Sequence, residues 1–145
     1  MQELSSKIIR KYNYVKTKDF VEDLLFDLKH LGLKLTCLLP PNAGRQISFM
    51  EKVYESKGNS SKQERYLEKK EQIEYEIKKE LEKLEDSISL LSENERIVFE
   101  ETFIYQNMDS DVEDKYGWSH VKTVHIKKSM IIKIALSKGA YYEKE

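Results

Sequence analysis

The sequence predicts an all-α protein with an N-terminal helical region, a long connecting helix and a C-terminal helix-turn-helix. Charged residues make up 35% of its 145 residues and apolar residues 39%. Only five glycines and two prolines are present, which favours elongated, solvated helices over a compact α/β core. Apolar residues also recur at spacings of three and four along most of the chain. A large, deep active site is therefore not expected.

The first amphipathic helix is expected over residues 17–31. Thr17 is the expected N-cap of this helix, and Gly32 is its expected C-terminal stop. His30 should therefore lie at the helix end, as a cation or as a partner to a carbonyl. The apolar positions that share one face are Phe20, Val21, Leu24, Leu25, Leu28 and Leu31.

Two breaks are expected after this helix. A Pro-Pro pair followed by an Asn/Gly turn signal predicts a loop over residues 40–46. A short helix is expected over 47–55, before the sequence SKGNSS interrupts the chain at 56–61. These breaks delimit an N-terminal helical region, residues 1–60, for which we expect a role in oligomerisation or partner contact.

Residues 61–91 are predicted to form one long connecting helix. Its apolar side chains fall on one stripe, interrupted at Lys70: Tyr66, Ile73, Ile77, Leu81, Leu84, Ile88 and Leu91. The later part of the stripe resembles a coiled-coil seam. Packing on the first helix of the same chain and pairing in a homodimer both fit this pattern.

Capping signals divide the last part of the chain, residues 92–145, into three helices. Ser92 and Glu95 form a capping box that opens a helix over 93–107. A second capping box, Ser110 with Glu113, is expected to open a short helix over 110–116.

Gly117 is expected to close the short helix and supply a tight turn. Ser119 caps the last helix, which should run to about Ser137 with Gly139 as its terminator. Two helices joined by a short turn that contains Gly form a helix-turn-helix.

Charge is strongly segregated although the formal net charge is only −1. Residues 91–114 carry one basic and eight acidic side chains, whereas residues 115–145 carry seven basic and two acidic ones. No acid lies between Lys115 and Tyr142. A polyanion meets one face of a protein and not its average charge, so the last helix is expected to attract DNA.

A DNA-reading helix must bury one face and expose the other. The predicted buried stripe consists of Thr123, Ile126, Met130 and Ile134; an alternative register buries Val124 and Ile131 instead of Thr123 and Met130. The candidate DNA-binding residues are His120, Val121, Lys122, His125, Lys127 and Lys128. Lys133 and Lys138 flank the stripe and are expected, like Lys127, to contact backbone phosphates.

Other chemistry has little support in the sequence, and we expect no enzyme activity, catalytic residue, cofactor or metal site. The carboxylates of residues 109–114 lack the spacing of a calcium loop, and acids are favoured in the first turn of a helix. His120 and His125 are five residues apart, so they do not share the helix face that a zinc pair needs. The single Cys37 is expected to be a small buried apolar residue.

The last part of the chain resembles a known family. The residues that carry the resemblance are Leu91, Arg96, Phe99, Tyr105, the segment 111–117, Trp118, Ser119, Thr123, Ile126, Met130, Ile134 and Ala135. They are similar to the helix-turn-helix of sigma-factor region 4 and, more narrowly, to phage and mobile-element late-gene activators of the RinA/ArpU type. In that family a small aliphatic residue usually stands in place of Trp118, and Ala or Gly is common in place of Glu113.

The resemblance implies a transcription regulator that binds double-stranded DNA and activates phage or mobile-element late genes with host RNA polymerase or its sigma factor. The positions that face DNA in that family correspond to His120, Val121, Lys122 and His125 of this sequence. A possible homodimer would use the N-terminal and connecting helices. The alternatives are a small terminase-like DNA-packaging subunit and a sigma- or anti-sigma-type interaction module that binds no DNA.

A cytoplasmic protein without membrane contact is expected. The apolar runs are far shorter than the ~20 residues needed to cross a bilayer. The N-terminal residues also lack the continuous apolar core of a signal peptide.

Overall fold

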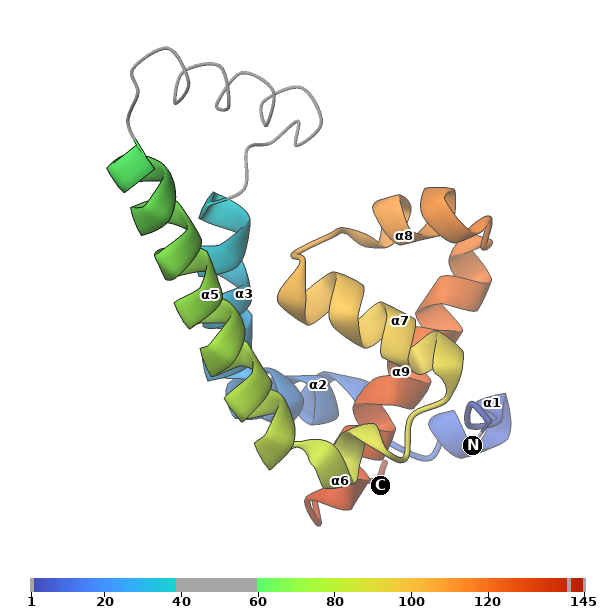
Figure 1. The fold of residues 1–145 in the computed structure, drawn as a ribbon. Helices are drawn as coiled ribbons and strands as arrows, with labels where there is room; N and C mark the ends of the chain where they lie inside the picture. Colours follow the sequence, from blue (N-terminus) through green and yellow to red (C-terminus); the bar gives the residue numbers. More distant parts are fainter. Residues whose placement is uncertain (1, 39–59, 141, 145) are drawn as a thin grey trace.

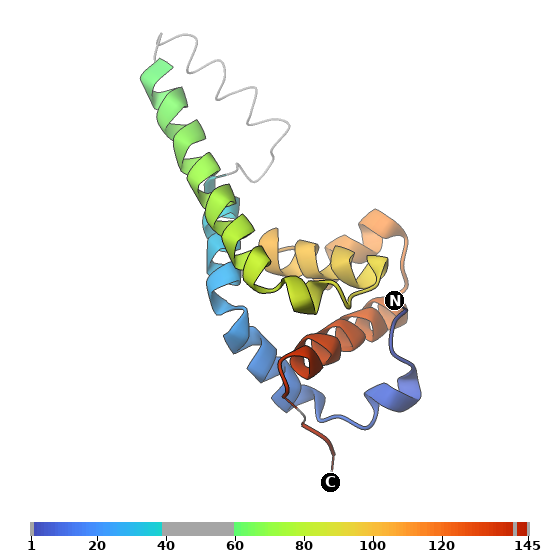
Figure 2. The same cartoon turned by 60° about the horizontal axis from the view of Figure 1, so that its bottom comes forward.

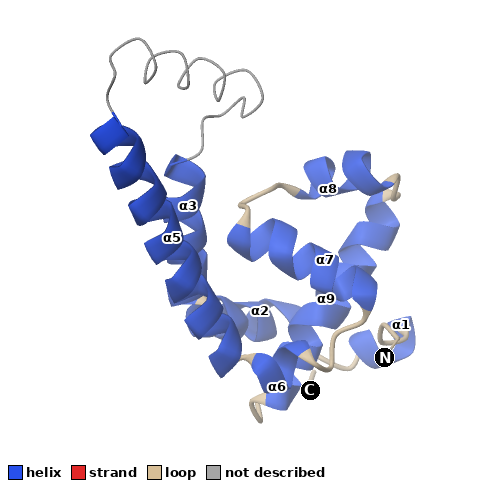
Figure 3. Ribbon diagram, viewed as in Figure 1, coloured by secondary structure: helices blue, strands red, loops and turns tan. Residues whose placement is uncertain are grey.

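The computed structural model describes residues 2–38, 60–140 and 142–144, and these residues form an all-α fold (Figures 1 and 3). The predicted fold class is confirmed. Pairing of the β type is limited, within these ranges, to one bridge between Tyr12 and Glu143. The predicted loop at 40–46 and helix at 47–55 lie outside the described residues. None of the described helices combines the length and the apolar character needed to cross a membrane.

The N-terminal part contains α1 (Ser6–Ile9), α2 (Tyr14–Leu24) and α3 (Phe26–Leu38). The prediction that Thr17 caps the first long helix is wrong. Asn13 is the cap, because its side chain accepts a hydrogen bond from Lys16 N at 3.2 Å. Thr17 lies one turn inside the helix, where its buried hydroxyl donates to Asn13 O at 2.8 Å.

Two further features of this region differ from the prediction. The backbone is kinked at Leu25 (φ −96°, ψ 10°), which separates α2 from α3. Helix α3 does not stop at Gly32 but continues to Leu38. Gly32 is a packing residue, since an added Cβ would lie 2.5 Å from Ile104 O and 2.6 Å from Phe103 O. His30 is consequently in the middle of α3, exposed and stacked on Phe26, and not at a helix end.

The connecting segment is two helices, α5 (Ser60–Lys83) and α6 (Glu85–Ile88), and not the single helix predicted over 61–91. The break is at Leu84 (φ −102°, ψ 8°), whose side chain is buried in the core. The break predicted at 56–61 lies mostly outside the described residues, and its last two residues are already helical.

Helix α5 packs on α3 of the same chain, and both views show the two helices side by side (Figures 1 and 2). Of the two predicted uses of the apolar stripe, the structure therefore contains the intramolecular one. Ile77 and Leu84 of the stripe are buried, and Ile73, Leu81 and Ile88 pack partly buried against the core.

The C-terminal part consists of α7 (Glu93–Phe99), the π-helical segment η1 (Glu100–Ile104), α8 (Asp109–Tyr116) and α9 (His120–Ser137). The capping box at the start of α7 is confirmed. Ser92 Oγ accepts from Glu95 N at 3.2 Å, and Glu95 Oε1 accepts from Ser92 N at 2.9 Å. The helix ends at Ile104 and not at 107, because its last turn widens into η1.

The predicted capping box of Ser110 and Glu113 is wrong. Helix α8 begins one residue earlier, at Asp109, after the extended residue Met108. Asp111, at the third helical position, accepts from Met108 N at 2.9 Å. The residue at the predicted cap, Ser110, is therefore already inside the helix.

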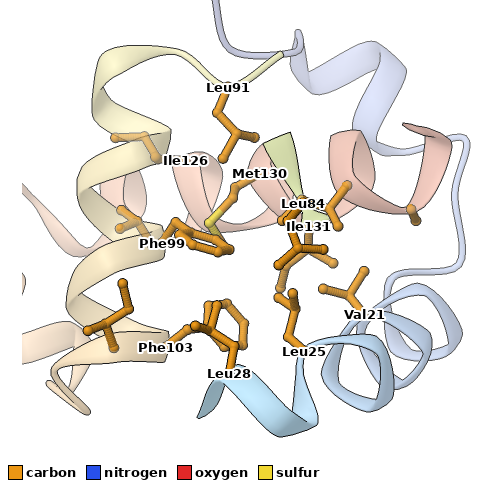
Figure 4. Close-up of a cluster of buried hydrophobic side chains, with 14 of the residues drawn as sticks. Val21, Leu25, Leu28, Leu84, Leu91, Phe99, Phe103, Ile126, Met130 and Ile131 are labelled. Carbon is orange, nitrogen blue, oxygen red and sulfur yellow. The ribbon is translucent and has the colours of Figure 1, made fainter. Parts of the chain in front are cut away.

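Helix α9 is the centre of the molecule. Helices α1, α2, α6, α7 and α8 all pack on it. Figure 4 shows the resulting core, in which Ile126, Met130 and Ile131 of α9 meet apolar side chains from the N-terminal helices and from α7. The N-terminal and C-terminal parts of the chain consequently share one hydrophobic core.

Candidate nucleic-acid interface

The turn between α8 and α9 has the predicted geometry. Gly117 adopts the left-handed conformation (φ 69°, ψ 31°), which residues with a Cβ rarely adopt. The backbone amide of Trp118 donates to Glu113 O at 3.1 Å and closes the end of α8. Ser119 Oγ accepts from Lys122 N at 3.2 Å and opens α9. Both predicted roles, Gly117 as the turn and Ser119 as the cap, are confirmed.

The predicted buried stripe of α9 is also confirmed, since Thr123, Ile126, Met130 and Ile134 are all buried. The alternative register is wrong at Val124, which is only half-buried, although Ile131 is buried as well. From Ser129 to Ala135 every side chain is buried, because α2 and the N-terminal segment cover the face opposite α7 and α8. Exposure of α9 is therefore confined to its first half and its C-terminal end.

The exposed first turn of α9 carries three of the six predicted DNA-binding residues. His120, Val121 and Lys122 are exposed, and Val121 retains 79% of its surface. His125 lies one turn further on the same face as Val121 and is half-buried. A large aliphatic side chain that is exposed beside cations is available for contact with an apolar group of a ligand, such as a thymine methyl.

Acidic side chains of α8 lie against this basic helix. His120 Nδ1 lies 2.8 Å from Glu113 Oε1, and Lys127 Nζ lies 3.3 Å from Asp109 Oδ1. The sequence between Lys115 and Tyr142 contains no acid, but acidic side chains of α8 lie beside this segment in the folded protein. The expectation of an acid-free surface over the whole helix is thus wrong, and part of its positive charge is compensated within the protein.

Lys122 is the exposed cation of the first turn. Its Nζ lies 5.2 Å from the centre of the Trp118 ring, which also stacks on Tyr116 with ring centres 5.3 Å apart. Trp118 is half-buried and packs against the core. Within the described ranges no carboxylate lies within ion-pair distance of Lys122, so its charge is available to a ligand.

Lys128 is placed differently. It is half-buried, with Nζ 5.3 Å from the centre of the Tyr14 ring at the start of α2. Burial, and to a smaller extent the charges of Asp109 and Glu22, raises the pKa of Tyr14 to about 12, so this phenol is neutral at physiological pH. The six predicted residues are therefore not equivalent, because Lys127 and Lys128 point toward other elements of the protein.

Lys133 does not flank an exposed stripe, and its predicted phosphate contact is wrong. Its side chain is 5% exposed and its Nζ lies 2.6 Å from Oε1 of Glu95, which is fully buried. Nζ also donates to Gln2 O at 2.7 Å and to Leu90 O at 3.2 Å. Lys133 thus joins α9 to the start of α7 and to the N-terminus.

A second ionic contact supports the end of α8 and was not predicted from the sequence. Glu101 of η1 accepts from Lys115 Nζ at 2.7 Å and also from Asn107 and Tyr116. Burial would raise the pKa of Glu101, but these hydrogen bonds and the Lys115 charge outweigh it and hold the pKa below its ordinary value. The carboxylate therefore stays ionised and fixes the residues that precede the turn.

The remaining candidate residues are not part of an assembled chemical site. Cys37 is exposed at the end of α3 and not buried as predicted. No group of three or more side chains suited to a metal ion occurs within residues 2–38, 60–140 and 142–144. The carboxylates of Asp109, Asp111 and Glu113 serve as ion-pair or capping partners inside the protein.

Comparisons of the chain with protein-family models, with curated proteins and with solved structures found no match.

Proposed function

We propose that this protein is a sequence-specific DNA-binding transcription regulator in which the first turn of α9 enters the major groove of duplex DNA. One observation carries the proposal: after the left-handed turn at Gly117, α9 projects His120, Val121 and Lys122 into solvent while Thr123 and Ile126 hold it against the core. A DNA-reading helix needs this combination of a short turn, a buried seam and an exposed N-terminal end.

The exposed residues would contact different chemical groups of the duplex. Lys122 provides a cation for phosphate or for a guanine edge, and Val121 provides an apolar contact for a thymine methyl group. In this proposal the half-buried His125, one helical turn further, contacts a neighbouring base pair. The free backbone N–H groups at the start of α9 favour a phosphate at the same end of the helix.

The regulatory role is proposed from the resemblance of residues 91–139 to late-gene activators. In this proposal the protein assists the host RNA polymerase holoenzyme at late promoters of a phage or mobile element. In this proposal the protein acts together with a sigma factor and does not replace it.

The test begins with selection of duplexes from a random-sequence library by the full-length protein. Fluorescence anisotropy then measures the affinity for the selected duplex and for a scrambled one at a series of salt concentrations. We expect the logarithm of the association constant to fall with the logarithm of salt with a slope of about −0.9 for each phosphate contacted.

Two variants assign the surface, and a third provides the control. Lys122→Gln should weaken binding to selected and scrambled duplexes alike if it contacts phosphate, whereas His125→Ala should change the sequence that the selection recovers. Lys78→Gln removes an exposed lysine from α5, far from the turn, and should leave binding unchanged. All three substitutions are at exposed or half-buried positions, and far-UV circular dichroism checks that folding is retained.

Absence of binding to any duplex by the folded full-length protein would contradict the proposal. That result is what a protein-interaction module would give. A ring of many subunits in solution, combined with DNA binding, would favour the DNA-packaging alternative instead.

A further inference from the structure

A second cationic surface lies beside α9, in the part of the chain that precedes Asp19. Residues 4–18 contain five basic side chains and no acidic one. We propose that Lys7, Arg10, Lys11 and Lys16 bind the phosphate backbone of the same duplex that α9 reads, next to the groove that α9 enters. This inference rests on the proposed function, and it assigns DNA contact to a region for which the sequence suggested oligomerisation or partner contact.

The four cations are free to meet an external anion. All four side chains are exposed, and within the described ranges no carboxylate lies within ion-pair distance of any of them. The fifth basic residue, Lys18, differs because its Nζ is 4.0 Å from Glu22 of the same helix. By contrast, Lys127 of α9 is paired with Asp109 of α8, and His120 is hydrogen-bonded to Glu113. The N-terminal segment therefore carries four exposed cations whose charge no described carboxylate compensates.

The segment is hydrogen-bonded to the helix that carries the candidate DNA-reading residues. Leu4 N donates to Ser129 Oγ at 2.7 Å, and Gln2 O accepts from Lys133 Nζ at 2.7 Å. Tyr14, at the start of α2, lies beneath Lys128. Figures 1 and 2 both place α1 beside α9, on the side away from α5.

The C-terminus supports the connection between α1 and α2 from the other side. Asn13 N donates to Tyr142 O at 2.6 Å, and Lys144 N donates to Lys11 O at 2.8 Å. The cations on and after α1 are thus attached to a backbone that is hydrogen-bonded at both ends. A fixed array loses less conformational entropy on binding than a flexible tail does.

Duplex DNA fits this surface better than an anionic membrane does. A helix that binds in a membrane interface needs a continuous apolar face beside its charges. Helix α1 has only four residues, and the exposed large apolar side chains of the segment, Ile8 and Val15, lie on two different helices and form no continuous apolar face. Positive side chains at a fixed distance from a reading helix match the common pattern in which phosphate contacts set the register and base contacts specify the sequence.

The test compares three proteins by fluorescence anisotropy, using a short duplex of mixed sequence as the probe. The first is wild type and the second is the triple variant Lys7→Gln/Arg10→Gln/Lys11→Gln. The third is a matched control, Lys69→Gln/Lys78→Gln/Lys79→Gln, which removes the same charge from exposed positions of α5. We expect the N-terminal variant to have a salt slope less steep by about 2.7, from three contacts at 0.9 each, whereas the control keeps the wild-type slope.

The single variant Lys16→Gln provides a second measurement that does not depend on α1. Its slope should be less steep by about 0.9. Sequence preference, measured by selection from a random library, should be the same as in wild type for both N-terminal variants, because they lose phosphate contacts only.

The outcomes separate this inference from the proposed function. If wild type binds DNA and Lys122→Gln weakens binding, but the N-terminal triple variant behaves like the α5 control, the inference is wrong and the proposed function stands. If the N-terminal variants lose binding while Lys122→Gln and His125→Ala do not, the proposed role of α9 is wrong, and the inference is wrong in its claim that both surfaces contact one duplex. Binding of the N-terminal surface to phosphatidylserine vesicles, with no effect of its variants on DNA binding, would also overturn the inference.

Discussion

The buried ion pair of Lys133 and Glu95 allows a quantitative test of how α9 is held. Nζ and Oε1 are 2.6 Å apart, and both side chains are buried. Oε1 also accepts from Ser92 N in the capping box, whereas Oε2 has no hydrogen-bond partner. We consider Lys133→Met, which is similar in length to lysine but removes the charge and all three donated hydrogen bonds.

The expected loss follows from the unpaired carboxylate. Removal of one partner of a buried pair leaves an uncompensated charge and destabilises a protein by about 3–5 kcal/mol. Unfolding entropy scales with length and is about 0.3 kcal/mol/K for a chain of this size, so the midpoint of thermal unfolding should fall by roughly 10–16 °C. Glu95→Gln in the same chain removes the orphaned charge but keeps an oxygen for Ser92 N. The double variant Lys133→Met/Glu95→Gln should therefore recover most of the loss.

The measurement is urea unfolding followed by far-UV circular dichroism, for the two single variants, the double variant and wild type. Lys78→Met is the matched control, because it makes the same change at an exposed helical position, on α5. Its effect should stay within about 0.5 kcal/mol. A double-mutant cycle then isolates the interaction between the two side chains.

Two results would refute this reasoning. A free energy of unfolding for Lys133→Met within about 1 kcal/mol of wild type would show that the carboxylate is not left unpaired in a low-dielectric site. Additive losses in the double variant would show that the two side chains do not stabilise each other.

Three further predictions concern Gly32 of α3, the turn at Gly117 and Glu101 of η1. Gly32→Ala should lower the free energy of unfolding by about 1–3 kcal/mol, despite the better helix propensity of alanine, because its Cβ would lie 2.5 Å from Ile104 O; unchanged urea midpoints would contradict this. Gly117→Ala should lower it by about 1–2 kcal/mol because of the left-handed φ of 69°. Gly117→Asn should lose less, and equal losses would show that the left-handed backbone is not the cause. The folded-state pKa of Glu101 lies below its ordinary value of 4.5. The stabilisation by its carboxylate is therefore complete above that pH and is lost as the pH falls through the folded pKa. Glu101→Gln should weaken the dependence of the unfolding free energy on pH below about 4.5, and identical pH profiles for variant and wild type would exclude this role.

The features of the last part of the chain that could be predicted from sequence are those with local causes. Ser92, Gly117 and Ser119 act on backbone groups within a few residues of themselves, so their types and positions are sufficient to predict caps and a turn. The buried seam at Thr123 and Ile126 follows from helical periodicity, because one face of α9 must meet the core. The same reasoning failed at Ser110, where Asp111 supplies a competing capping carboxylate one residue further along.

Contacts between distant segments could not be predicted in this way. From the sequence, Lys133 is predicted to be a surface lysine. Only the packing of α7 and the N-terminus around α9 places Glu95 beside it. From the sequence, Gly32 is predicted to end a helix. In the structure it is a packing residue, because the backbone of η1 lies directly against it. The acids of α8 and the cations of α9 are separate blocks in sequence, yet the turn folds Glu113 onto His120.

The sequence by itself determined the helical class of this protein, the turn at Gly117 and the cap of α9 at Ser119, because each depends on residues near one another in the chain. Which lysine and arginine side chains remain available to a ligand depends on the tertiary structure alone. Burial and ion pairing remove Lys133 and Lys127 from that set, whereas Lys122 and the N-terminal group at Lys7, Arg10 and Lys11 remain exposed. The physical reason is that charge pairing depends on distance in space, which is set only when the helices pack.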